Sequence, residues 1–144
     1  MSYINNMSIK FSARSENEAF ARVAVASFCS VVIKNIEILS DIKTAVSEAV
    51  TNAIVHGYNS DERGEIELEC KLCEDEVVIR ISDFGVGIEN INEAKKPFFT
   101  TKPDMERSGM GFTVMEGFMD KMEVETELNK GTVVTLTKKI DKIA

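Results

Sequence analysis

The stretch "DFGVGI", Asp83 to Ile88, places a carboxylate and two glycines directly after a predicted strand. A carboxylate at a strand end can accept a hydrogen bond from an exocyclic amine such as that of adenine. Gly85 and Gly87 would let the backbone approach a flat ring closely. A strand that ends in a glycine-rich turn is the structural alternative, so this stretch alone leaves its function open.

The letters Asp83-Phe84-Gly85 also match the D-F-G of protein kinases, in which the Asp binds magnesium under the nucleotide phosphates. That mechanism needs an H-R-D-x-x-x-x-N loop upstream and a lysine on a strand. The sequence contains neither, and 144 residues are too few for two kinase lobes. A P-loop motif is absent as well. The protein-kinase interpretation of these letters therefore fails.

A second glycine pair occurs in "RSGMGF", where a helix is expected to begin. Backbone amides at a helix N-terminus form an anion site suited to phosphates, and glycines permit close approach. The segment adds the hydroxyl of Ser108 and the cation of Arg107. Glycine pairs at helix starts are common, so this signal is weak by itself.

Glu48 and Asn52 lie four positions apart in "SEAVTNAIVHGY", and a helix therefore places them on one face. His56 follows one turn later. This polar face is separate from the apolar positions of the same helix. It could be a site or simply a solvated helix surface, and we expect His56 to be structural.

Two helices are expected to position these residues. The segment "SENE" is a capping box in which Ser15 caps the first helix and Glu18 bonds back to the Ser15 amide. The apolar residues of this helix follow at helical spacing: Phe20, Val23, Ala24, Phe28 and Val31.

The second helix is expected to begin after Ser40 and to end at Gly57, which would supply a left-handed C-cap. Its predicted core stripe is Ile42, Ala45, Val46, Ala49, Val50, Ala53 and Ile54.

Alternating strands account for most of the remaining chain. They are predicted at 8–13, 65–73, 77–83, 121–127 and 132–139, with a third helix at 110–120. The order β-α-α-β-β-loop-α-β-β predicts an α+β fold with one mixed sheet and all helices on one face. We expect one domain over residues 1–144, without repeats or an internal boundary.

The composition excludes several classes of function. The net charge is −7 with no clustered basic segment, which argues against binding a nucleic-acid backbone. No apolar run is long enough to span a membrane, and the N-terminus lacks the pattern of an export signal. We therefore expect a cytoplasmic protein. The Cys70-x-x-Cys73 pair lacks a second ligand pair, so we interpret it as structural rather than as a metal or redox site.

In combination, "SEAVTNAIVHGY", "DFGVGI" and "PFFTTKP…RSGMGF" resemble the GHKL (Bergerat) ATP-binding fold of histidine kinases, type II topoisomerases and related ATPases. The resemblance implies a two-layer α/β sandwich with a mixed, mostly antiparallel sheet. It also implies ATP and Mg²⁺ as cofactors and an ATP lid over about residues 89–108.

The resemblance assigns roles to individual residues. Glu48 matches the general base and Asn52 the magnesium ligand of the family's E-x-x-x-N motif. Asp83 matches the residue that binds the adenine amine. The other matching nucleotide-binding positions are Gly85 and Gly87 beneath the ring, Thr101, Arg107, Ser108, Gly109, Met110 and Gly111 near the phosphates, and Thr132 near Asp83.

Over nearly the whole chain, the sequence resembles the small stand-alone GHKL serine kinases that act as anti-sigma factors in endospore-forming bacteria. "FSARSENEAFARV" extends the likeness to the N-terminus. These kinases are homodimers that inhibit a sporulation sigma factor of the sigma-F type and phosphorylate an anti-anti-sigma factor on serine. Arg22 matches a position on their partner surface.

Two alternatives remain open from the sequence. One is a catalytic domain of the histidine-kinase type, for which "PFFTTKP" is suggestive, although no upstream helical segment with an acceptor His is present. The other is a non-catalytic binding module that ATP switches, in which Glu48 would be a solvated helix residue.

Overall fold

The computed structural model describes residues 3–95 and 111–140. Its elements, in chain order, are β1 (Tyr3–Ser12), α1 (Asn17–Ser30), α2 (Ile36–Asn52), the π-helical turn η1 (Ala53–Gly57), β2 (Glu65–Cys73), β3 (Glu76–Asp83), α3 (Ile91–Ala94), α4 (Gly111–Phe118), β4 (Lys121–Glu127) and β5 (Gly131–Lys139). Most of the expected lid, with Thr101, Arg107, Ser108, Gly109 and Met110, lies outside the described residues.

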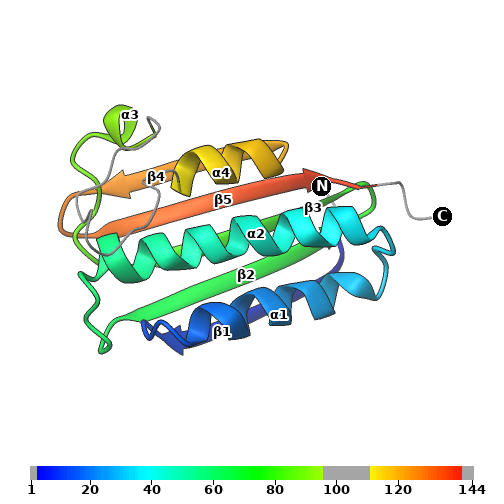
Figure 1. Cartoon of the computed structure of the whole chain (residues 1–144), viewed down its shortest axis with the longest axis horizontal. Coiled ribbons are helices and arrows are strands. Elements are labelled where there is room, and N and C mark those ends of the chain that lie inside the picture. Colours follow the sequence, from blue (N-terminus) through cyan, green and yellow to red (C-terminus); the bar gives the residue numbers. More distant parts are fainter. Residues whose placement is uncertain (1–2, 96–110, 141–144) are drawn as a thin grey trace.

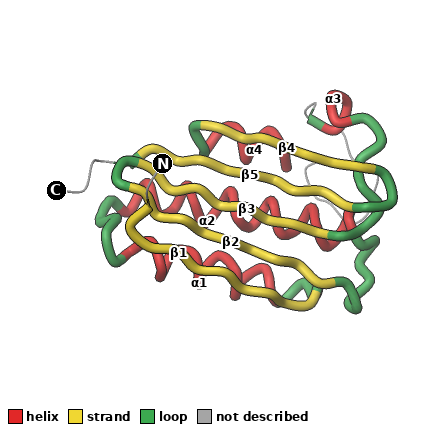
Figure 2. Tube along the Cα trace, turned by 180° about the vertical axis from the view of Figure 1, so that it is seen from behind, coloured by secondary structure: helices red, strands yellow, loops and turns green. Residues whose placement is uncertain are grey.

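One five-stranded sheet in the order β1-β2-β3-β5-β4 forms one layer of the molecule. Helices α1, α2 and α4 cover one face of it, and the other face carries no helix among the described residues (Figures 1 and 2). The predicted two-layer α+β fold is confirmed. The sheet, expected to be mixed, is antiparallel at every described pairing. β1 is longer than predicted, because its pairing with β2 extends back to Tyr3 opposite Cys73.

Helix α2 lies across the sheet and supplies much of the core. All seven residues of its predicted stripe are buried, with Ile42, Val46 and Val50 at 0% exposure. The helix begins four residues before the predicted cap Ser40. Asn35 is the N-cap instead, since its side-chain oxygen accepts from the amides of Glu37 and Ile38 at 2.8 and 3.1 Å.

Helix α1 differs from its prediction in two respects. Ser15 makes no side-chain cap, and the Glu18 carboxylate accepts from Arg22 instead of reaching back. The buried positions of α1 are Ala21, Val25 and Cys29. Phe20, Val23 and Val31 of the predicted stripe are 52%, 57% and 69% exposed, since the face that α1 buries is the one that carries Ala21, Val25 and Cys29.

The end of α2 is also different from the prediction. Gly57 is not in the left-handed region, and α2 continues into the π-helical turn η1 instead. The positive φ values occur later, at Asn59 (53°) and Ser60 (62°). Single π turns in helices are frequently found at functional sites. Here the turn brings the end of the long helix against the end of β3.

Candidate functional site

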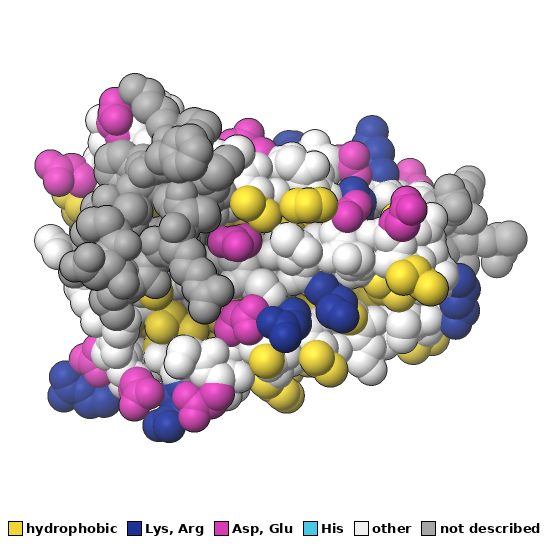
Figure 3. Space-filling view, in the orientation of Figure 1, with side chains coloured by type: hydrophobic (Ala, Val, Ile, Leu, Met, Phe, Trp, Pro, Cys, Tyr) yellow, Lys and Arg dark blue, Asp and Glu magenta, His cyan; other side chains and the backbone are white. Residues whose placement is uncertain are grey.

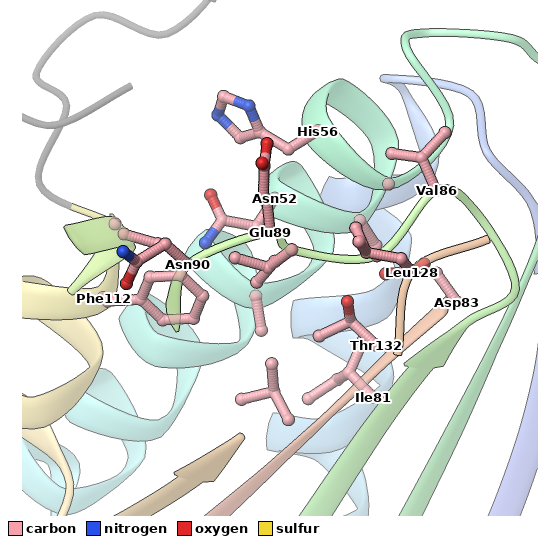
Figure 4. A pocket seen from close by; sticks show the side chains of 18 of the residues that line it. Asn52, His56, Ile81, Asp83, Val86, Glu89, Asn90, Phe112, Leu128 and Thr132 are labelled. Carbon is pink, nitrogen blue, oxygen red and sulfur yellow. The ribbon is translucent and has the colours of Figure 1, made fainter. Parts of the chain in front are cut away.

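A cavity of about 890 Å³ opens at the end of the molecule where α2, the β3 terminus, the start of α4 and the β4–β5 hairpin meet. Figure 4 shows side chains from these segments pointing into it. Five of the sequence-predicted site residues line it, namely Asn52, Asp83, Gly87, Gly111 and Thr132. Residues from both halves of the chain therefore form one site.

Asp83 is a buried carboxylic acid of the cavity wall, only 6% exposed. Burial raises its pKa from 3.8 to about 6, while hydrogen bonds from the backbone amides of Gly85 and Thr132 act in the opposite direction. The Gly85 amide lies 3.0 Å from Asp83 Oδ1. A buried carboxylate that is ionised near neutral pH needs donors, and an exocyclic amine of a ligand can be one.

Gly57 explains why Asp83 can occupy this place. A Cβ atom at position 57 would come within 2.7 Å of the Asp83 carboxyl carbon. The Gly57 carbonyl also accepts from the Val86 amide at 2.9 Å. Gly85 packs against that same carbonyl and is not among the described residues that line the cavity. Its amide donates to the Asp83 carboxylate, so this glycine helps to hold Asp83 in place.

Tyr58 also holds the loop that follows Asp83. Its hydroxyl accepts from the Phe84 amide at 2.7 Å and donates to the Glu65 carbonyl at 2.5 Å. The hydroxyl thus joins the start of β2 to the residue after Asp83. Neither Gly57 nor Tyr58 was assigned a site role from the sequence, although "HGY" begins only four residues after Asn52.

Asn52 is the residue of α2 that enters the cavity. A Cβ on Gly111 would approach its side-chain oxygen to 2.9 Å, so the start of α4 packs tightly on this amide. Glu48 lies one turn earlier, half-buried, and is not among the described residues that line the cavity. The predicted shared face of Glu48 and Asn52 follows from their four-residue spacing within α2.

Thr132 stands opposite Asp83 across β3 and β5 and is 7% exposed. Its hydroxyl lies 2.9 Å from that of Thr126 on β4. The Thr126 hydroxyl also accepts from the Ile88 amide at 2.8 Å. Thr126 was missed from the sequence, because its place opposite Thr132 depends on the register between β4 and β5.

His56, which we expect from the sequence to be structural, lines the cavity near its mouth (Figure 4). Glu89, Asn90 and Glu93 also line the cavity. Arg22 is remote from this site in the sequence and lies on α1, where it pairs with Glu18 at 2.7 Å.

Within residues 3–95 and 111–140, no three His, Cys, Asp or Glu side chains come together as a metal site. Mg²⁺ is commonly held by one or two protein oxygens together with nucleotide phosphates, and the Asn52 amide in the cavity fits that mode. The cysteines are free thiols, and Cys29 Sγ lies 3.9 Å from Cys70 Sγ in the core. Of the described helices, none has the length and apolarity to cross a bilayer.

The chain matches the family described as "Histidine kinase-like ATPase domain" over residues 11–138. An anti-sigma F factor of Clostridium perfringens is 56% identical over 137 residues, which cover 95% of this chain and 98% of that protein. An anti-sigma F factor of Geobacillus thermodenitrificans is 56% identical over 138 residues, which cover 96% of this chain and 94% of that protein.

Two solved structures share the fold at low identity. The RsbU and RsbW domains of a Mycobacterium tuberculosis protein align with a TM-score of 0.68 at 19% identity, over 98% of this chain and 33% of that one. The catalytic domain of the histidine kinase ThkA aligns with a TM-score of 0.54 at 20% identity, over 92% of this chain and 97% of that one.

Proposed function

Since the chain belongs to the histidine kinase-like ATPase domain family and, within it, to the anti-sigma F factors, we propose that it is an ATP-dependent serine protein kinase and anti-sigma factor. It binds and inhibits a sigma factor of the sigma-F type, and it phosphorylates an anti-anti-sigma factor on serine. The observation that carries the proposal is the buried carboxylate of Asp83 in the wall of a nucleotide-sized cavity.

Asp83 receives the adenine amine of ATP. In the nucleotide-free protein its carboxylate accepts from two backbone amides, and a carboxylate has room for further donors. The apolar side chains of Ile81, Val86 and Leu128 line the cavity around it and suit the faces of a purine. The phosphates then extend toward Asn52 and Gly111.

Glu48 acts as the general base of phosphoryl transfer. A serine hydroxyl is a weak nucleophile, and a carboxylate near the γ-phosphate can accept its proton while the new oxygen–phosphorus bond forms. The bond from the γ-phosphorus to the bridging oxygen breaks in the same step, and that oxygen leaves with ADP. Mg²⁺ supplies charge neutralisation between the phosphates when it is bound. Asn52 would hold that ion, and Gly111 packs against the Asn52 amide at the start of α4.

Arg22 on α1 forms part of the surface for protein partners. Phe20 and Val23 beside it are 52% and 57% exposed, and apolar side chains are visible along α1 in Figure 3. Aromatic, aliphatic and arginine side chains in one patch are typical of protein interfaces.

The protein works as a homodimer, and sedimentation analysis of the purified chain tests that state.

One assay tests the kinase activity. The protein is incubated with Mg²⁺, ATP labelled at the γ-phosphate and a candidate anti-anti-sigma protein. We expect acid-stable phosphoserine on the partner, and loss of it in Glu48→Gln. The matched control is Glu125→Gln, since Glu125 is an exposed glutamate on β4. Acid-labile phosphohistidine, or tight ATP binding without transfer, would contradict the proposal.

A second assay tests the partner surface. Arg22→Glu is expected to weaken the complex with the sigma factor at least about tenfold, because it reverses a charge beside exposed apolar groups. ADP affinity should stay unchanged. Arg63→Glu, at an exposed loop position, is the control. An unaltered complex in Arg22→Glu removes this residue from the partner surface.

A further inference from the structure

The last residue of η1 and the residue after it, Gly57 and Tyr58, hold the loop that follows Asp83. The Gly57 carbonyl accepts from the Val86 amide at 2.9 Å. The Tyr58 hydroxyl accepts from the Phe84 amide at 2.7 Å. Tyr58 is not among the described residues that line the cavity, so any effect of its side chain on a ligand must pass through this loop.

The Tyr58 hydroxyl stands between two strands at the point where their pairing stops. The register of β2 with β3 ends with Ile66 opposite Asp83. One further step of an antiparallel ladder would place Glu65 opposite Phe84. The Phe84 amide and the Glu65 carbonyl are bonded instead to the one hydroxyl, at 2.7 and 2.5 Å. The hydroxyl oxygen therefore occupies the place of a direct N–H···O=C bond between β2 and β3.

The ring of Tyr58 is held by its own loop so that the hydroxyl reaches this place. A Cβ on Gly64 would come within 2.5 Å of the ring carbon Cγ of Tyr58, so the ring lies directly on this glycine. The Gly64 carbonyl accepts from the Ala13 amide at 2.8 Å, which joins the glycine to the end of β1. The positive φ values of Asn59 and Ser60 turn the chain directly after the ring. The backbone alone thus sets the position of the hydroxyl.

We propose that Tyr58 is a positioning residue of the nucleotide site, whose hydroxyl ends the pairing of β2 with β3 one residue pair early and so directs the loop after Asp83 to the cavity. This inference rests on the proposed ATP site. Val86 and Gly87 of that loop line the cavity. A ligand in the cavity therefore depends on where the loop leaves the sheet.

Removal of this hydroxyl alone affects binding and stability differently. The Phe84 amide and the Glu65 carbonyl would both lose their partner, and a direct bond between them satisfies both groups. The fold therefore keeps most of its stability, because no buried polar group is left unpaired. The loop, however, is drawn toward β2 and away from the cavity. The Gly85 amide moves with it, and this amide donates to Asp83 Oδ1 at 3.0 Å.

The test compares Tyr58→Phe with the wild type in the full chain, by calorimetric titration of ADP with Mg²⁺ and by urea denaturation without nucleotide. We expect the ADP affinity to fall about tenfold while the urea midpoint stays close to that of the wild type. An NMR coupling across a hydrogen bond from the Phe84 amide to the Glu65 carbonyl should appear only in the variant. Tyr3→Phe is the matched control, since it removes the other tyrosine hydroxyl of the chain, at the opposite end of β1, and should change neither property.

A merely structural role of Tyr58 would lower the urea midpoint and leave the ADP affinity unchanged, and that result overturns the inference. Weaker ADP binding without the new bond between Phe84 and Glu65 also overturns it. If Tyr58→Phe does not fold, as judged by its thermal unfolding curve, Gly64→Ala takes its place, because its Cβ displaces the same ring. Failure of the wild type to bind ADP refutes the proposed ATP site itself, which is a distinguishable outcome.

Discussion

Replacement of Asp83 by Asn is expected to stabilise the nucleotide-free protein while it weakens ADP binding. The pKa of Asp83 is raised by burial from 3.8 to about 6. A group with a raised pKa in the folded state binds its proton more tightly when folded. The stability that this proton contributes is complete below about pH 3.8 and is lost as the pH rises to about 6.

The size of the expected stabilisation follows from the difference between the pKa of Asp83 in the folded protein and its ordinary value. A shift of about two pKa units corresponds to about 3 kcal/mol of unfolding free energy at neutral pH. Asn has no charge to bury, and its side-chain oxygen can still accept from the Gly85 amide. Because the NH₂ group of the Asn side chain also needs hydrogen-bond acceptors, we expect the unfolding free energy of the variant to rise by only about 1–3 kcal/mol at pH 7.5.

The assay is urea denaturation of both proteins without nucleotide, between pH 4 and pH 7.5. The gain in Asp83→Asn should shrink as the pH falls and should vanish near pH 4. ADP affinity of the variant at pH 7.5 should be lower by about tenfold or more, since a hydrogen bond to a charged acceptor is lost. Asp75→Asn, at an exposed turn position, controls for the removal of one carboxylate.

The reasoning is refuted if Asp83→Asn is less stable than the wild type at pH 7.5, or if the difference between them does not change with pH. Either result would mean that burial of the ionised group does not oppose folding. A gain in stability together with unchanged ADP affinity would support the electrostatic argument, but it would refute the proposal that Asp83 binds adenine.

Three further substitutions test the surroundings of the site and the packing of the helices. Gly57→Ala should abolish ADP binding, because its Cβ would fall 2.7 Å from the Asp83 carboxyl carbon; an ADP titration that matches the wild type contradicts this. Gly117→Ala should raise the unfolding free energy by about 0.5–1 kcal/mol in urea denaturation, since Gly117 is helical and an added Cβ would meet no described atom within 4 Å beyond its chain neighbours and the backbone of its own helix; a loss of stability would disprove it. Lys138→Met should destabilise the fold by about 2 kcal/mol, because Lys138 Nζ lies 3.1 Å from Asp41 and 2.7 Å from the Phe118 carbonyl. The thermal unfolding midpoint should fall accordingly. In the Lys138→Met protein, the additional change Asp41→Asn should lower the unfolding free energy by less than it does in the wild type.

The sequence predicted the elements with regular patterns well. The α2 stripe, the alternation of β2 and β3, and the Gly-containing turn before β5 all have local causes in residue spacing and turn chemistry. The predicted apolar stripe of α1 was wrong at Phe20, Val23 and Val31, although Phe28 does pack against the core. Periodicity alone does not tell which of two apolar faces of a helix is covered. Ala21 and Cys29 are small enough to pack closely, and Phe20 is left outside.

For the site, the residues that a ligand would touch were easier to predict than those that hold them. Asp83, Asn52 and Thr132 lie in short motifs. Tyr58, Thr126 and the close contact at Gly57 depend on how α2, β3 and β4 meet in space. The π turn that brings Gly57 against Asp83 has no distinctive residue pattern, so a left-handed glycine cap was the natural expectation.

The central claim, that Asp83 receives the adenine of ATP, is tested most directly by a crystal structure of the protein grown with ADP and Mg²⁺. The account predicts the adenine amine within hydrogen-bond distance of the Asp83 carboxylate, about 2.7–3.2 Å. It also predicts the phosphates near Asn52 and Gly111. A nucleotide bound with its base away from Asp83, or bound outside this cavity, would contradict the account.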